Sequence, residues 1–65
     1  MNKKEKLEEI GRLCKKYRRL KKIRQIDIAK DLDVSISTIS LFENGKSDSL
    51  YIFLAYIKND IITNI

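Results

Sequence analysis

The chain has 65 residues, of which 43% are hydrophobic and 35% charged, with no proline and no histidine. This length allows one domain with one small core, and the composition excludes an intrinsically disordered chain. The absence of histidine, with Cys14 as the single cysteine, excludes a zinc site, an internal disulfide and histidine-based catalysis. No apolar run is long enough to cross a membrane, so we expect a cytoplasmic protein. We also expect that the protein needs no cofactor.

The positive charge is concentrated in the first third of the chain. The net charge is +5, but residues 1–24 contain eleven Lys or Arg and three Glu, whereas residues 25–65 contain three Lys and six Asp or Glu. A distribution this uneven favours a polyanionic partner, most simply nucleic acid. The alternative interpretation is a solvated basic helix face that keeps the protein soluble.

The first helix is predicted at about residues 5–21. Asn2 is placed to cap its start, and Gly11, which is unfavourable inside a helix, indicates a close approach of another helix. Apolar residues recur at the spacing of one helical face, which we expect to pack into the core. They are Ile10, Leu13, Cys14, Tyr17 and Leu20.

Two shorter helices are predicted at about residues 25–32 and 36–43, joined by a tight turn. Asp33 occupies the position in the turn that needs a left-handed backbone, which aspartate tolerates better than most residues. Ser35 is a good N-cap for the second of these helices, and Gly45 is placed to end it. We expect the inward-facing residues to form one apolar seam, with a small alanine where the helices cross: Ile28, Ala29, Leu32, Val34, Ile39 and Phe42.

The last helix is predicted at about residues 48–60, and residues 61–65 form either a further short turn or a frayed end. Its buried stripe, by helical spacing, is predicted to be Leu50, Phe53, Leu54, Ile57 and Ile61. Because this helix is apolar on nearly every side, the remaining apolar residues are expected to form a surface for self-association or for a partner. This partner surface consists of Tyr51, Ile52, Tyr56, Ile61, Ile62 and Ile65.

The run from Gln25 to Lys46 resembles the helix-turn-helix of phage-repressor and Cro-like regulators, the XRE family. The matching residues are Gln25, Ile28, Ala29, Leu32, Val34, Ser35, Ile39 and Glu43-Asn44-Gly45-Lys46, with Arg18 at the position where the family usually has an arginine. The resemblance covers about residues 10–61. It implies an all-α fold: a compact four-helix, lambda-repressor-like domain spanning residues 1–65, with the helix-turn-helix at residues 25–44.

The resemblance also implies roles for individual residues. The helix at 36–43 is expected to enter the major groove of double-stranded DNA. The positions at or near the base edges match Ser35, Ile36, Ser37, Ser40 and Leu41. The positions that contact phosphates match Arg24, Gln25, Thr38, Asn44 and Lys46. Arg18 and Glu43 match a pair that usually forms an ion pair inside the fold.

The base-facing positions depart from the family's usual chemistry. They commonly hold Arg, Gln or Asn, which form bidentate hydrogen bonds with guanine or adenine. Here Ile36 and Leu41 are apolar, and Ser37 and Ser40 are short. We therefore expect weak, thymine-biased or indirect base recognition.

Two functions follow from these observations. The first is a small transcriptional regulator, such as a phage-type repressor, that binds a palindromic DNA site as a homodimer. The second is a protein-interaction module that binds another regulator without reading DNA; the apolar Ile36 and Leu41 and the negative charge of residues 25–65 motivate it. No nucleophile–base pair, phosphate-binding glycine loop or metal cluster is present in the sequence, so we do not expect an enzyme.

Overall fold

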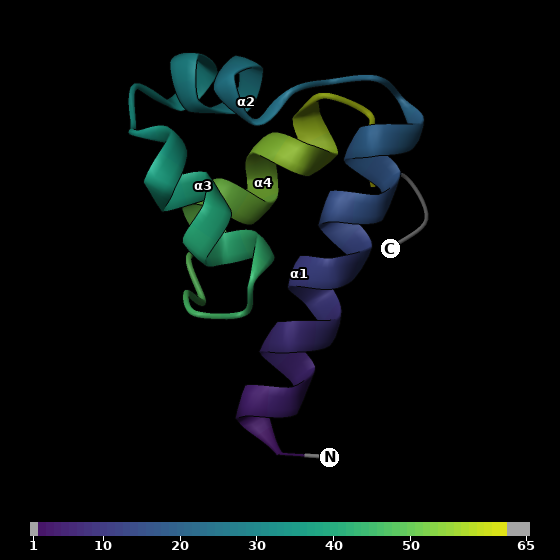
Figure 1. The fold of residues 1–65 in the computed structure, drawn as a ribbon, viewed down its shortest axis with the longest axis vertical. Helices are drawn as coiled ribbons and strands as arrows, with labels where there is room; N and C mark the ends of the chain where they lie inside the picture. Colours follow the sequence, from purple (N-terminus) through teal and green to yellow (C-terminus); the bar gives the residue numbers. More distant parts are fainter. Residues whose placement is uncertain (1, 63–65) are drawn as a thin grey trace.

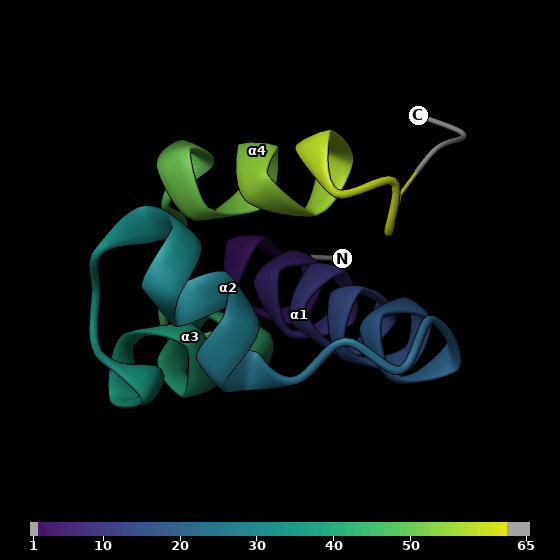
Figure 2. The ribbon, with the colours of Figure 1, turned by 90° about the horizontal axis from the view of Figure 1, so that it is seen from above.

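A computed structural model describes residues 2–62. This part of the chain forms four α-helices: α1 (Lys3–Leu20), α2 (Gln25–Leu32), α3 (Ile36–Glu43) and α4 (Leu50–Lys58). The three short helices lie together beside α1, whose N-terminal turns extend beyond them (Figure 1). Seen from above, α4 lies on one side of the molecule and the other three helices lie together below it (Figure 2). The predicted all-α fold is confirmed.

The helix bounds agree closely with the sequence for the helix-turn-helix and less closely elsewhere. The helices predicted at 25–32 and 36–43 have those bounds, whereas α1 begins at Lys3 and ends at Leu20. The last helix was predicted at 48–60 and is shorter at both ends. No helix within residues 2–62 is long and apolar enough to cross a membrane.

Short polar side chains begin three of these helices. The side-chain oxygen of Asn2 accepts a hydrogen bond from the backbone N–H of Glu5 at 2.8 Å. Ser35 and Ser49 accept from the third residue of α3 and α4, each at 3.2 Å. Such caps satisfy N–H groups that have no acceptor inside the helix, and each contributes about 1 kcal/mol.

A residue with a left-handed backbone follows the end of each helix in the described chain. Lys22, Asp33 and Asp60 have φ near 57–58°, and Gly45 has φ 74°. After α3, the N–H of Gly45 donates to Phe42 and the next N–H donates to Leu41, at 3.1 and 2.9 Å. These bonds satisfy carbonyls at the helix end. Three of the four positions hold a residue other than glycine, for which this conformation costs about 1–2 kcal/mol.

The backbones of α1 and α3 touch at Gly11. A Cβ atom built on Gly11 would lie 2.5 Å from the carbonyl oxygen of Glu43 and 2.6 Å from that of Phe42. Gly11 is itself buried. The close helix approach predicted from this glycine is therefore present, and it fixes which face of α1 packs inward.

The core is formed by nine hydrophobic residues from all four helices and the segment after α4. They are Cys14, Ile28, Ala29, Ile39, Phe42, Ile52, Ala55, Tyr56 and Ile61. Ile23, Leu32, Val34, Phe53 and Ile62 are half-buried against them. The predicted seam between α2 and α3 accordingly forms the centre of the molecule.

The predicted buried stripe of α1 is wrong except for Cys14. Ile10, Leu13, Tyr17 and Leu20 are between 37% and 67% exposed, and the buried residues of α1 are Gly11, Cys14 and Arg18. The hydrophobic periodicity did not reveal this face because two of its three residues are not apolar. Close backbone packing at Gly11 and an ion pair at Arg18 determine it instead.

The predicted buried stripe of α4 is only partly right: Ile61 is buried and Phe53 packs against the core, but two of its leucines are exposed. Leu50 and Leu54 are 66% and 50% exposed, whereas Ile52 and Tyr56 are buried. The helix thus buries the residues that the sequence assigned to its outer side, because the hydroxyl of Tyr56 has a hydrogen-bond partner in the core.

The partner surface changes as a result. Ile52, Tyr56 and Ile61 are buried and cannot belong to it, and Ile62 is half-buried against the core. Tyr51 remains exposed. Ile65 lies outside the described residues.

The Gly11 contact gives a stability prediction of unusual sign. In a solvent-exposed helix, Gly→Ala stabilises by about 1 kcal/mol. Here Gly11→Ala should lower the free energy of unfolding by about 1–3 kcal/mol, because the new Cβ collides with backbone atoms that cannot easily move. Urea unfolding followed by circular dichroism measures the change. Lys16→Ala, on an exposed part of the same helix, serves as the control, and a gain in stability for Gly11→Ala would contradict the contact.

Candidate nucleic-acid interface

Helix α3 presents one side to solvent. Ile36 and Leu41 are 46% and 52% exposed. Ser37 is exposed as well, and Ser40 is half-buried. The helix has eight residues, and the diameter of an α-helix with its side chains, about 10–12 Å, fits the roughly 12 Å width of the DNA major groove. The shape of this side suits insertion into a groove.

The polar side chains on this side are short and partly engaged with each other. The hydroxyls of Ser35 and Thr38 lie 2.9 Å apart. The amide nitrogen of Asn44 donates to the carbonyl of Ser40 at 2.9 Å and to its hydroxyl at 3.3 Å. None of these side chains can form a bidentate pair with a guanine, and the exposed isoleucine and leucine offer apolar contact such as that with a thymine methyl.

Gln25 begins α2 and is fixed by a hydrogen bond across the fold. It is half-buried, and its amide nitrogen donates to Oε1 of Glu43 at 2.9 Å. Because the carboxylate accepts only, the amide oxygen of Gln25 faces away from it. The first N–H groups of α2 have no acceptor within the helix and carry partial positive charge. The positive end of the α2 dipole is therefore held beside the end of α3.

Glu43, the last residue of α3, is the acceptor for donors from the three other helices. Arg18 of α1 donates from Nε to Oε2 at 2.7 Å and from Nη2 to Oε1 at 3.1 Å. Tyr56 of α4 donates its hydroxyl to Oε2 at 2.6 Å, and Gln25 supplies the donor from α2. Arg18 also donates to the carbonyl of Ile23 at 2.7 Å. This Glu43 network joins all four helices, and Arg18 and Glu43 are the residues that the family resemblance pairs.

The network holds its charges fixed near neutral pH. Burial by itself would raise the pKa of Glu43, but the hydrogen bonds from Arg18, Tyr56 and Gln25 outweigh it and lower the pKa. Burial, followed by the bond to Glu43, raises the pKa of Tyr56. Burial and the charge of Glu43 raise the pKa of Cys14 to about 12, so this thiol stays protonated and unreactive.

Four of the five phosphate residues implied by the resemblance lie at the ends of the helix-turn-helix, whereas Thr38 is half-buried in the first turn of α3. Arg24 is exposed, and its guanidinium pairs with Asp27 at 3.1 Å. The carboxylate of Asp27 also accepts a hydrogen bond from the backbone N–H of Arg24 at 2.9 Å. This bond caps the start of α2. Lys46 is exposed just beyond the end of α3. Asp48, which follows Lys46 by two residues, is paired with Lys3 at 3.1 Å.

A polar hollow lies where α1 ends, α2 begins and α3 passes beside them. We call it the basic hollow. Its lining includes cations from the C-terminal half of α1 and from the connection to α2, which approach Gln25 and Ser40. The lining residues are Lys15, Arg18, Arg19, Lys22, Ile23, Arg24, Gln25 and Ser40. The uneven charge of the sequence indicated a basic region, but its position next to α3 emerges only from the fold.

Sequence reasoning missed the role of Tyr56. Its ring stacks against Phe42 with the centroids 5.6 Å apart, and its hydroxyl reaches Glu43. A tyrosine in a helix that is apolar all around gives no periodic signal. Only the requirement that the Tyr56 hydroxyl find a hydrogen-bond partner when buried could have predicted that this side chain faces the core.

Comparison with known protein families agrees with this geometry. A family model described as Helix-turn-helix matches residues 15–49 of the chain. The match covers more than half of the sequence and runs from the middle of α1, through α2 and α3, to the residue that caps α4. No curated protein and no solved structure matched the chain.

The Glu43 network predicts how stability depends on Tyr56. Tyr56→Phe should lower the free energy of unfolding by about 1.5–3 kcal/mol, since a hydrogen bond to a buried carboxylate is removed. A lowered carboxylate pKa stabilises the fold above the unfolded pKa of about 4.3, and this stabilisation is lost as the pH falls through the folded value. Because Tyr56 helps lower the pKa of Glu43, acid unfolding of the variant should begin at a higher pH than in the wild type.

Tyr51→Phe is the matched control for this measurement. The hydroxyl of Tyr51 donates to the carbonyl of Leu32 at 3.2 Å, at an exposed position. Its removal should change the free energy of unfolding by less than about 0.5 kcal/mol and leave the acid transition in place. Identical acid transitions for the wild type and Tyr56→Phe would contradict the proposed effect on Glu43.

Proposed function

The chain belongs to the helix-turn-helix family of phage-repressor and Cro-like regulators, the XRE family, and we propose that it binds a palindromic DNA site as a homodimer. Membership of this family makes it a DNA-binding regulator of transcription. In our proposal α3 enters the major groove, and the two half-sites lie about 34–36 Å apart, one turn of the duplex. A DNA ligand also favours a cytoplasmic protein.

The observation that carries this proposal is the way in which the Glu43 network ties α2 to the end of α3. The side chain of Gln25 donates a hydrogen bond to Glu43, and this bond joins the first turn of α2 to the end of α3. Arg24 and Gln25 lie at one end of the helix-turn-helix, and Asn44 and Lys46 lie at the other. This arrangement supports phosphate contacts on both sides of the major groove, which position α3 without reading sequence.

The proposed base contacts are few and mostly apolar. Ile36 and Leu41 suit contact with thymine methyl groups, while Ser37 and Ser40 suit single hydrogen bonds. Most of the affinity should therefore come from phosphates, and much of the selectivity from DNA shape and flexibility.

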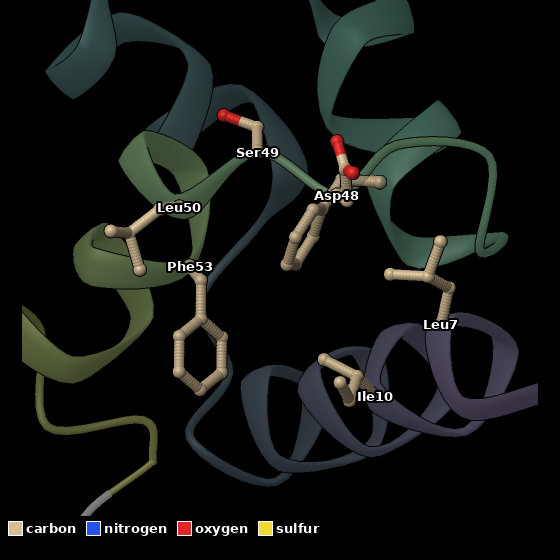
Figure 3. Close-up of a pocket in the computed structure, with 7 residues that line it drawn as sticks. Leu7, Ile10, Asp48, Ser49, Leu50 and Phe53 are labelled. Atoms are coloured by element: carbon tan, nitrogen blue, oxygen red, sulfur yellow. The ribbon is translucent and has the colours of Figure 1, made fainter. Parts of the chain in front are cut away.

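The homodimer is supported by the apolar surface that the fold leaves uncovered. All leucines of the chain lie within residues 2–62, and each is exposed or only half-buried. A pocket between α1 and α4 is lined mainly by Leu7, Ile10, Phe42, Leu50 and Phe53. Figure 3 shows Leu7 and Ile10 facing this pocket from α1, and Phe53 facing it from α4. A chain this short gains only about 3–5 kcal/mol from its own core, so a second copy here would add needed apolar burial.

A second candidate function rests on the exposed Ile36 and Leu41 of α3. By the family resemblance, both side chains occupy positions that commonly hold polar base-reading residues, and both are about half exposed. Such a surface also suits an apolar patch on another regulator, which this chain would then modulate without reading DNA. The DNA measurement below separates the two functions.

DNA binding should show a steep dependence on salt. In fluorescence anisotropy with genomic DNA fragments, each phosphate contact should steepen the fall of log affinity with log salt by about 0.9. Gln25→Ala and Lys46→Ala should weaken binding to all sequences, whereas Ser37→Ala should alter sequence preference. Lys58→Ala, on α4, is the control for removal of a single charge. If the wild type fails to bind at low salt, the second candidate function replaces the first.

The proposed dimer surface can be tested with one lysine substitution. Leu50→Lys places a charge in the pocket between α1 and α4, and should convert a dimer into a monomer in light scattering without loss of helical circular dichroism. DNA affinity should fall with it, because the monomer binds only one half-site. Leu20→Lys is the control, since Leu20 is 67% exposed, nearly as Leu50 is, and does not line the pocket. A monomeric wild type would contradict the proposed homodimer.

A further inference from the structure

We propose that the basic hollow is a second phosphate-binding surface, through which Lys15, Arg19 and Lys22 bind the DNA backbone beside the segment that α3 reads. This inference rests on the proposed DNA binding and extends it. The contacts implied by the family resemblance come from residues 24–46, whereas these three cations come from α1 and the connection that follows it.

The basic hollow adjoins the helix-turn-helix. Its lining includes Ser40, whose neighbour Leu41 lies on the exposed side of α3, and Gln25, which begins α2. The cations of α1 therefore approach the same region as the first turn of α2, where N–H groups favour anions. A duplex seated on α3 brings a phosphate strand past this corner, because the backbone runs along both edges of the groove.

The charges in the hollow divide into compensated and uncompensated groups. Arg18 is neutralised by Glu43, and Arg24 shares its charge with Asp27. Lys15, Arg19 and Lys22 take no part in the ion pairs formed among residues 2–62. Arg19 and Lys22 are exposed, and Lys15 is half-buried. These three side chains can contact an external anion without breaking an internal bond.

The opposite side of α1 lacks this geometry. An α-helix turns 100° per residue, so Lys6 and Lys16 each project about 140° away from Gly11, which contacts α3, whereas Lys15 projects about 40° away from it. Lys6 and Lys16 do not line the hollow, nor does Lys58 of α4, which lies on the other side of the molecule from α3 (Figure 2). The chain thus supplies a control set with the same charge and a different position.

The experiment compares two triple variants, each of which removes three positive charges. The test variant carries Lys15→Gln, Arg19→Gln and Lys22→Gln, and the control variant carries Lys6→Gln, Lys16→Gln and Lys58→Gln. Affinity for genomic DNA fragments is measured by anisotropy over a range of salt concentrations. Helical content and thermal midpoint are measured first. Arg18 is left intact in both variants, so the Glu43 network is retained.

In the test variant, the slope of log affinity against log salt should become shallower by about 0.9 for each phosphate that the protein no longer neutralises, hence by about 2 to 3. At roughly 0.15 M salt this corresponds to a decrease of about a hundredfold in affinity. The control variant should change the slope by less than about 1, because its charges act only at a distance.

The other outcomes overturn the inference. Equal effects of the two triple variants would mean that net charge alone is responsible, and no effect of the test variant would mean that DNA does not reach the hollow. In both cases the proposed function survives, since the wild type still binds DNA. Absence of DNA binding by the wild type at low salt is the different result that overturns the proposed function itself, together with this extension of it.

Discussion

The carboxylate of Glu43 is the polar group on which the arrangement of the four helices depends. It stands at the end of α3 and accepts hydrogen bonds from Arg18, Gln25 and Tyr56, one residue from each of the other helices. Burying such a charge costs several kcal/mol unless its partners satisfy it fully, and within residues 2–62 no buried side-chain polar atom lacks a partner. A different rotation of α1 or α4 would leave that charge unsatisfied, so the network selects one packing among several that hydrophobic burial alone would allow.

This dependence explains what could and could not be predicted from the sequence. The helix-turn-helix was predictable because its signals are local: Ser35 as a cap, Asp33 in the turn, and an apolar seam around Ala29. The buried faces of α1 and α4 were not, because Gly11 acts through a backbone contact and Tyr56 through a hydrogen bond 13 residues away in the chain. Periodicity counts apolar residues, whereas these two faces are set by a glycine and by polar groups.

The residues suited to phosphate contacts and those suited to base contacts lie in different parts of the fold. Polar and charged groups surround α3 at the start of α2 and beyond its own C-terminal end, while α3 itself offers short or apolar side chains. A protein of this kind should bind many DNA sequences with similar strength and gain selectivity by joining two weak half-sites. The exposed leucines along α1 and α4 fit that need, because a dimer binds both half-sites in one event.

At Lys22, backbone geometry favours glycine, whereas the proposed phosphate contact favours lysine. It follows α1 with φ 58°, a conformation that glycine adopts with less strain, and it lines the basic hollow. Glycine there would relieve backbone strain but remove an ammonium group from the proposed phosphate-binding surface. Laboratory selection for thermal stability alone should therefore favour glycine at this position, whereas selection for operator occupancy should keep the lysine. Under the proposed function, Lys22 exchanges some stability of the folded chain for a positive charge beside the DNA.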